Sequence, residues 1–248
     1  MSKRAKARKE QKLAIKREWQ IAQREQRWQQ TAWIRRLWAW IGMAVAGSVL
    51  LAGLVIGGIK LFQAYSPTIK ISGPFGSIKR TELAQNRFAI LQTTEGNIKL
   101  ELDTKNTPKT AANFVLLAKQ NFYDGIKFHR IMKDFMIQTG DPLSKNDDPA
   151  DDGTGGPGYQ FDSEKIIGDY TRGTLAMANA GENTNGSQFF IVHKDTNLPK
   201  NYVIFGKVVE GMDVVDKIAE MPVQDNGQGE VSQPTKDVVI EKVMLSSS

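Results

Sequence analysis

The segment FHRIMKDFMIQTGD, residues 128–141, overlaps two strand-like runs and contains one of the two histidines of the chain. In a strand, alternate residues share a face, so Phe128, Arg130 and Met132 should point one way and His129 the other. A guanidinium group that shares a face with apolar side chains is unusual unless it has a task. We therefore interpret Arg130 as the candidate functional residue. We expect His129 to be a structural residue on the opposite face, hydrogen-bonded to backbone.

The β pattern continues on both sides of this segment. Residues 87–103, RFAILQTTEGNIKLELD, alternate around Glu95-Gly96-Asn97 and predict a hairpin. Helical spacing predicts a helix in PKTAANFVLLAKQ, residues 108–120, and a shorter one in GMDVVDKIAEM, residues 211–221. Many short strand-like runs with closely spaced turns then predict an all-β barrel or sandwich. These runs lie at 126–132, 135–139, 173–178, 188–193, 202–209 and 237–245.

The N-terminal part differs in composition from the rest of the chain. Residues 1–36 hold twelve Lys or Arg and three Glu, a net charge of +9, whereas residues 37–248 carry a net charge of −3. Residues 37–59 have no charge, and as a helix they would span about 34 Å, enough for a bilayer core of about 30 Å. Tryptophans and arginines flank this run, as at a membrane interface. We predict a basic cytoplasmic tail (1–36), a transmembrane helix (37–59), a linker (60–85), an extracytoplasmic β domain (86–245) and a C-terminal tail (246–248).

Several alternatives concern this N-terminal part. A cleaved signal peptide is disfavoured because its n-region would be 36 residues long and Pro67 follows the weak cleavage site at 64–66. The spacing of Gly53 and Gly57 is one that membrane-helix dimers use, although glycine is common in membrane helices. The basic tail could lie on anionic lipid, or form a solvated helix or a disordered arm. The charge of the remaining chain predicts no nucleic-acid partner.

Three other motifs are rejected because the residues around them do not fit. GTGGPG, residues 153–158, has the glycine spacing of a dinucleotide-binding loop, but neither a buried strand before it nor a helix after it. The acidic run before Gly153 lacks the glutamate that a calcium loop needs, because Tyr159 stands at that position. Ser187 does not lie in the nucleophile elbow of hydrolases. With no cysteine in the chain, thiol nucleophiles are excluded, and we predict neither a metal nor a cofactor.

Four segments carry a family resemblance. FHRIMKDFMIQTGD, GTGGPGYQF, GTLAMANAGENTNGSQFFI and VIFGKVVEGMDVVDKI occur in this order and resemble the successive signatures of the cyclophilin family of peptidyl-prolyl cis/trans isomerases. The resemblance covers residues 86–245. It implies a closed eight-stranded antiparallel barrel capped by two helices, with the active site on the outer barrel surface. It also implies that the partners are proline-containing polypeptides.

The resemblance assigns roles to individual residues. The family's catalytic arginine falls on Arg130. Two positions depart from the best-known members: Asn197 stands where those have a tryptophan, in a segment one residue shorter, and Tyr202 stands where they have a histidine. The missing tryptophan implies weakened binding of cyclosporin-type inhibitors. The substrate-binding residues that the resemblance implies are Phe135, Met136, Phe190 and Leu198 around the proline ring, Gln138, Ala178, Asn179 and Gln188 along the substrate backbone, and Tyr202.

These features together predict a membrane-anchored isomerase. It would act on polypeptides that fold on the extracytoplasmic side of a membrane, where slow X-Pro isomerisation limits folding. The alternative from a different class is a proline-binding chaperone or scaffold module in which catalysis is incidental.

Overall fold

The computed structural model describes residues 68–71, 76–146, 148–227 and 229–247. Contacts divide the chain into two units, residues 1–64 and 65–248, and all described residues belong to the second. The predicted basic tail, the predicted span at 37–59 and the Gly53 and Gly57 pair lie outside the described residues. Within the described ranges, no helix is long and apolar enough to cross a membrane.

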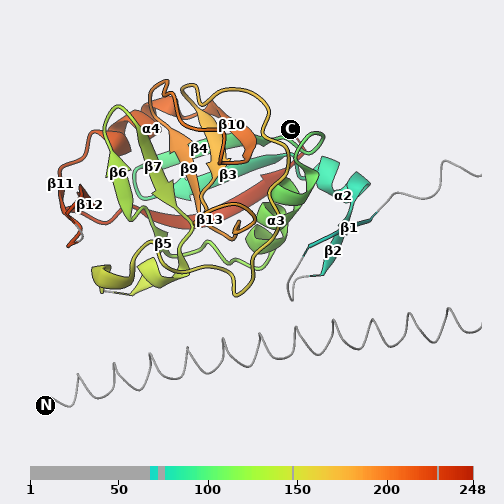
Figure 1. Cartoon of the computed structure of the whole chain (residues 1–248), viewed down its shortest axis with the longest axis horizontal. Helices are drawn as coiled ribbons and strands as arrows, with labels where there is room; N and C mark the ends of the chain where they lie inside the picture. The colour runs from blue at the N-terminus through green and yellow to red at the C-terminus, as the bar shows by residue number, and fades with distance from the viewer. Residues whose placement is uncertain (1–67, 72–75, 147, 228, 248) are drawn as a thin grey trace, which may run out of the picture. The chain divides into compact units, whose positions relative to one another are not determined.

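One antiparallel sheet forms the body of the described unit (Figure 1). Its strand order is β5-β13-β3-β4-β10-β8-β9-β7-β6, so strands that are distant in the sequence lie side by side. The strands are β3 (Phe88–Thr93), β4 (Gly96–Leu102), β5 (Ile126–Lys127), β6 (Arg130–Met132), β7 (Met136–Thr139), β8 (Thr174–Met177), β9 (Phe189–Val192), β10 (Ile204–Glu210) and β13 (Val239–Ser246).

Alternation explains the first hairpin of this sheet. Every second residue of β3 and β4 is buried, and Thr93 pairs with Gly96 across a tight turn. The hairpin predicted from residues 87–103 is therefore confirmed. In β8 and β9, by contrast, all residues are buried. Leu175 and Phe189 belong to the main core, whereas Ala176 and Phe190 belong to a second, smaller apolar cluster on the other face.

The predicted closed, eight-stranded barrel is corrected by this topology. The sheet has nine strands, and its edge strands are β5 and β6. These two strands are separated by only Phe128 and His129, so the sheet curls until its edges approach each other. The backbone N–H of Phe128 donates to the carbonyl of Val238, which keeps the chain on the β13 side until it turns into β6. Among the described residues no ladder joins β5 to β6, and the barrel is therefore open.

Two helices cover the sheet, as predicted. Helix α3 (Pro108–Lys119) and helix α4 (Met212–Ala219) lie on opposite sides of it (Figure 1). The N-cap residue of α3, Thr107, makes no side-chain capping bond. Instead, Glu164 accepts hydrogen bonds from the backbone N–H groups of Lys109 and Thr110 at 2.9 and 2.7 Å. Two short 3₁₀ helices, Pro142–Lys145 and Pro149–Asp151, follow β7.

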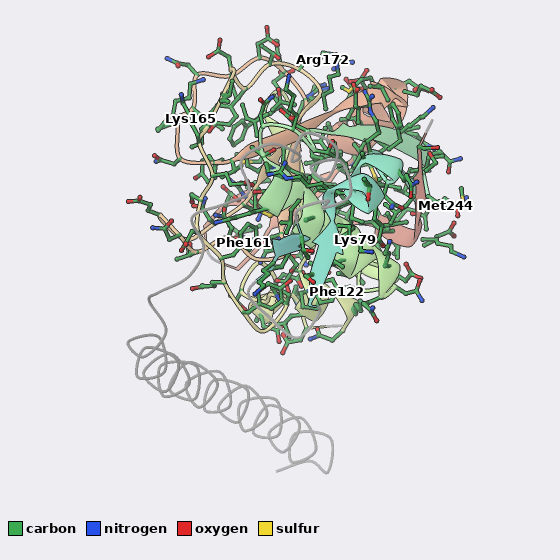
Figure 2. The ribbon with its side chains drawn as sticks, turned by 90° about the vertical axis from the view of Figure 1, so that its right-hand side faces the viewer. Lys79, Phe122, Phe161, Lys165, Arg172 and Met244 are labelled. Carbon is green, nitrogen blue, oxygen red and sulfur yellow. The ribbon has the colours of Figure 1, made fainter. Side chains whose placement is uncertain are left out.

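The predicted linker at 60–85 is corrected in its second half. Strands β1 (Thr68–Lys70) and β2 (Ser77–Lys79) form a hairpin, and helix α2 (Arg80–Gln85) follows directly. Figure 2 looks onto this side of the molecule, where Lys79 marks the junction of β2 and α2. Ile78 and Leu83 are buried in the main core, and Glu82 forms an ion pair with Lys119 of α3. Each strand has only three residues and buries one, which is too short for a recognisable period.

A second small hairpin lies outside the main sheet. Strands β11 (Val223–Asp225) and β12 (Val231–Pro234) pair with each other, and β12 packs against β6 (Figure 1). This hairpin was not predicted from the sequence. It lies beside the strand that carries Arg130.

Candidate active site

Strand register places the candidate residues in one row. Arg130 of β6 pairs with Gln138 of β7, Gln138 pairs with Phe190 of β9, and Phe190 pairs with Ala176 of β8. Directly opposed residues in a sheet point to the same face. A cation, an amide and an aromatic ring therefore lie side by side in one row across the outer face of the sheet.

The Arg130 guanidinium group is held along one edge. Its Nε donates to Glu230 Oε2 at 2.6 Å and its Nη2 donates to Glu230 Oε1 at 2.8 Å. The remaining nitrogen, Nη1, has only long contacts, with Gln138 Oε1 at 3.4 Å and Met136 Sδ at 3.8 Å. The guanidinium carbon also lies 5.9 Å from the centre of the Phe135 ring. The two N–H groups of Nη1 are thus the donors most available to a bound molecule.

Gln138 is oriented by a relay of hydrogen bonds. Its Nε2 donates to Gln188 Oε1 at 2.9 Å, and Gln188 Nε2 donates to the carbonyls of Gly153 and Gly155, each at 2.9 Å. These bonds fix which end of each amide is oxygen and which is nitrogen. The Gln138 oxygen therefore faces Arg130, and both side chains present fixed polar groups along the row.

An apolar wall lies next to these polar groups. Met136, Phe190 and Val192 are buried in the second cluster, with Phe135, Ala178, Leu198 and Tyr202 packed against it. The rings of Phe190 and Tyr202 meet edge to face with their centres 5.4 Å apart. Tyr202 is itself fixed, because its backbone N–H donates to the Tyr170 hydroxyl at 3.0 Å and its carbonyl accepts from that hydroxyl at 2.8 Å.

These groups surround a pocket of about 420 Å³. Ligand sites for small molecules typically have about 300–1,000 Å³ and combine apolar walls with a few polar groups. Nine of the ten predicted site residues line the pocket: Arg130, Phe135, Met136, Gln138, Ala178, Asn179, Phe190, Leu198 and Tyr202. The tenth, Gln188, does not line the pocket but is hydrogen-bonded to Gln138, which does.

The sequence interpretation missed one wall of the pocket. The β11–β12 hairpin contributes Asn226, Glu230, Ser232 and Gln233, and the loop before Gly153 contributes Asp152. The hairpin has no sustained alternation, so no strand signal marked it. From its sequence this loop was only judged to be neither a dinucleotide-binding loop nor a calcium loop, so its acidic residues had no predicted role.

His129 also lines the pocket, contrary to the expectation that it faces away. Its residue is 7% exposed, and neither ring nitrogen has a hydrogen-bond partner among the described residues. The predicted bond to backbone is therefore wrong. The reason is that residues 128 and 129 are not part of a strand but turn the chain between two sheet edges. Burial, and next the charge of Arg130, lowers the pKa of His129 to about 4.

Two carboxylates of the pocket have opposite electrostatic environments. Hydrogen bonds from Arg130 lower the pKa of Glu230 to about 2. Burial, followed by the charges of Asp141 and Asp151, raises the pKa of Asp152 to about 6. At neutral pH the pocket therefore contains one cation that is already paired with a carboxylate, and a second carboxylate without a comparable cation. Among the described residues, no group of three or more acidic, His or Cys side chains is arranged to hold a metal ion.

Comparison with known proteins identifies this arrangement. Residues 88–245 match the family model described as cyclophilin type peptidyl-prolyl cis-trans isomerase/CLD. The chain is 40% identical over 161 residues to peptidyl-prolyl cis-trans isomerase-like 3 of Gallus gallus, covering 64% of this chain and 95% of that protein. It is 39% identical over 176 residues to a peptidyl-prolyl cis-trans isomerase of Helicobacter pylori, covering 69% and 94%. It is 42% identical to the probable peptidyl-prolyl cis-trans isomerase B of Mycobacterium tuberculosis, of which it spans 52%.

Solved structures agree with the sequence comparisons. A cyclophilin type peptidyl-prolyl cis-trans isomerase of Cryptosporidium parvum, crystallised in the presence of the dipeptide Ala-Pro, superposes with a TM-score of 0.56 at 33% identity. The match covers 65% of this chain and 99% of that one. The family predicted from the four sequence segments is thereby confirmed, and the chain belongs to the cyclophilin-type peptidyl-prolyl cis-trans isomerases.

Proposed function

We propose that this chain accelerates rotation about X-Pro bonds with Arg130 as its catalytic donor. The observation that carries the proposal is the row of Arg130, Gln138 and Phe190, in which two fixed polar groups adjoin an aromatic wall over one pocket. Phe135, Met136, Phe190 and Leu198 would hold the proline ring. Gln138, Gln188, Ala178 and Asn179 would bind the substrate backbone.

Amide conjugation explains why such a site is sufficient. An X-Pro bond resists rotation with a barrier of roughly 18–20 kcal/mol, because the amide is conjugated. In the twisted transition state the prolyl nitrogen becomes pyramidal and gains a lone pair. A fixed donor that meets this lone pair stabilises the transition state more than the ground state. The Nη1 group of Arg130 suits this role, because it is permanently charged and lacks a short hydrogen bond to the described residues.

Replacement of Arg130 tests the assignment. We expect Arg130→Ala to lower kcat/KM for a proline peptide by on the order of 10²- to 10³-fold, the usual loss when one transition-state donor is removed. Arg130→Lys should recover only a part, because an ammonium group lacks the planar fork. Arg87→Ala is the matched control, since Arg87 is half exposed and pairs with Glu101 away from the pocket. The assay measures X-Pro isomerisation by the full chain, followed through cleavage of the trans peptide by an added protease, with circular dichroism as the check of folding.

The opposite outcome has a defined meaning. Near-normal turnover by Arg130→Ala would refute Arg130 as the donor. If the variant loses turnover yet rescues the folding of a proline-containing client as well as the unchanged chain does, the biological role is that of a proline-binding chaperone. Because Asn197 stands where the best-known members have a tryptophan, we also expect weakened binding of cyclosporin-type inhibitors.

The location of this activity is a separate proposal. The uncharged run 37–59 and the +9 tail before it support an N-terminal anchor with the tail in the cytoplasm and the isomerase domain outside. Protease added to intact cells or spheroplasts should then digest the domain without lysis. Protection of the domain until the membrane is lysed would refute this orientation.

A further inference from the structure

The β11–β12 hairpin places one carboxylate against the catalytic arginine. Backbone bonds fix Glu230 at the end of this hairpin: its N–H donates to Asn226 Oδ1 at 3.2 Å, and its carbonyl accepts from the Asn226 N–H at 2.9 Å. The hairpin packs on β6, so Glu230 is held close to Arg130 although 100 residues separate them in the sequence. Packing and backbone hydrogen bonds therefore fix the position of this carboxylate.

The geometry of the pair leaves one nitrogen of the guanidinium group available. Glu230 occupies Nε and one N–H of Nη2, and the Met132 sulfur lies 3.1 Å from Nη2. The third nitrogen, Nη1, has only long contacts, and these are with Gln138 and Met136, which line the pocket. A side-on pair of this kind fixes both the position of the guanidinium plane and its rotation about the arginine side chain.

We propose that Glu230 is a positioning residue that holds Arg130 so that Nη1 faces the rotating X-Pro bond. The inference rests on the proposed function, because it gives Glu230 its role through Arg130. A long arginine side chain has many rotamers, and a donor that must find its orientation in each turnover contributes less to catalysis. The Arg130 and Glu230 side chains are 31% and 34% exposed, so the pair lies at the pocket wall and water reaches part of it.

A competing effect gives the proposal its sharpest test. A carboxylate next to a catalytic cation also reduces the positive potential that the transition state meets. If this effect dominated, removal of the charge would accelerate turnover. If positioning dominates, removal slows turnover while the proline pocket still binds, because none of the apolar residues of the second cluster is changed.

The experiment measures kcat and KM separately for the full chain with an Ala-Pro peptide, by exchange NMR at several peptide concentrations. For Glu230→Gln we expect kcat to fall about tenfold or more, as for a misplaced catalytic group, and KM to change by less than about twofold. Glu210→Gln is the matched control, since Glu210 is mostly exposed and pairs with Lys99 on β4. A double variant, Arg130→Ala with Glu230→Gln, should be no slower than Arg130→Ala alone, because Glu230 would act only through Arg130.

Each outcome decides the matter. Unchanged or faster turnover by Glu230→Gln overturns the proposal, and so does an equal loss in the Arg130→Ala background, which would indicate a general disturbance of the hairpin. If Arg130→Ala is inactive while Glu230→Gln turns over normally, only this inference fails and the proposed function stands. If Arg130→Ala turns over normally, the proposed function fails whatever Glu230→Gln does.

Discussion

Acidification should destabilise the folded domain through His129. His129 is 7% exposed, neither nitrogen of its imidazole has a hydrogen-bond partner among the described residues, and its pKa lies at about 4 instead of 6.5. In the unfolded chain the same imidazole takes up a proton as the pH falls below about 6.5. Protonation then stabilises the unfolded state alone. The free energy of unfolding therefore falls between pH 6.5 and about 4, and below that range the loss stays constant.

The size of this effect follows from the two pKa values. A difference between 6.5 and about 4 corresponds to a maximum of about 3–4 kcal/mol, since one pKa unit is worth about 1.4 kcal/mol. Between about pH 7.5 and about pH 4.5, most of this free energy, roughly 2–3 kcal/mol, should be lost. This is a large share of the 5–15 kcal/mol by which domains are usually stable.

The assay is urea unfolding of the full chain at several pH values in one detergent, for the unchanged chain and for His129→Gln. Other groups titrate too, so the informative quantity is the difference in pH dependence between the two proteins. His129→Gln should lack about 2–3 kcal/mol of the acid-induced loss, whatever its stability at neutral pH. His129→Met serves as a second variant if glutamine folds poorly. Parallel pH profiles for unchanged and variant chains, or a measured imidazole pKa near 6.5, would refute the reasoning.

Two further predictions concern carboxylates. The pKa of Asp152 is raised from 3.8 to about 6, so this group destabilises the fold progressively as the pH rises between these two values. Asp152→Asn should therefore raise the free energy of unfolding by about 1 kcal/mol at pH 7.5 and by almost nothing at pH 4. The figure is well below the roughly 3 kcal/mol that the pKa alone gives, because water screens this half-buried group. Glu164→Ala removes the two backbone bonds at the start of α3 and should cost about 1–2 kcal/mol of stability without changing kcat/KM, as measured by thermal unfolding and peptide turnover. The neighbouring Asp162→Ala is its control, and equal melting temperatures of the two variants would contradict the capping role.

Local patterns predicted the parts of the fold that depend on local contacts. The β3–β4 hairpin and helix α3 follow from a period of two and from helical spacing, and both are confirmed. The edges of the sheet could not be predicted in this way. Residues 126–132 form one strand-like run, yet Phe128 and His129 turn the chain from β5 to β6, at the opposite edge. The curl of the whole sheet decides this break, and no residue in the run signals it.

The candidate site likewise contains residues that the sequence predicted and residues that it did not. Family motifs identified the row of Arg130, Gln138 and Phe190 because those residues lie in conspicuous strand segments. Glu230 and Asp152 were missed, since an acidic residue in a glycine-rich loop has the same appearance in a sequence whether water or an arginine is its partner. Glu230 differs from a solvated glutamate only through Arg130, which lies 100 positions earlier. Contacts of such separation depend on the complete fold.

Segments outside the main sheet orient the polar residues of the row. Glu230 of the hairpin holds Arg130, and Gln188 holds Gln138. Gln188 is itself bonded to the carbonyls of Gly153 and Gly155. Catalysis of a rotation requires donors at fixed angles, because a small misplacement of a group can cost about a hundredfold in rate. The sheet supplies the apolar wall of the pocket, and the loops supply the hydrogen bonds that orient Arg130 and Gln138. Substitutions in residues 153–155 and at Asn226 and Glu230 should therefore change turnover more than peptide binding, whereas substitutions in the apolar wall should do the reverse.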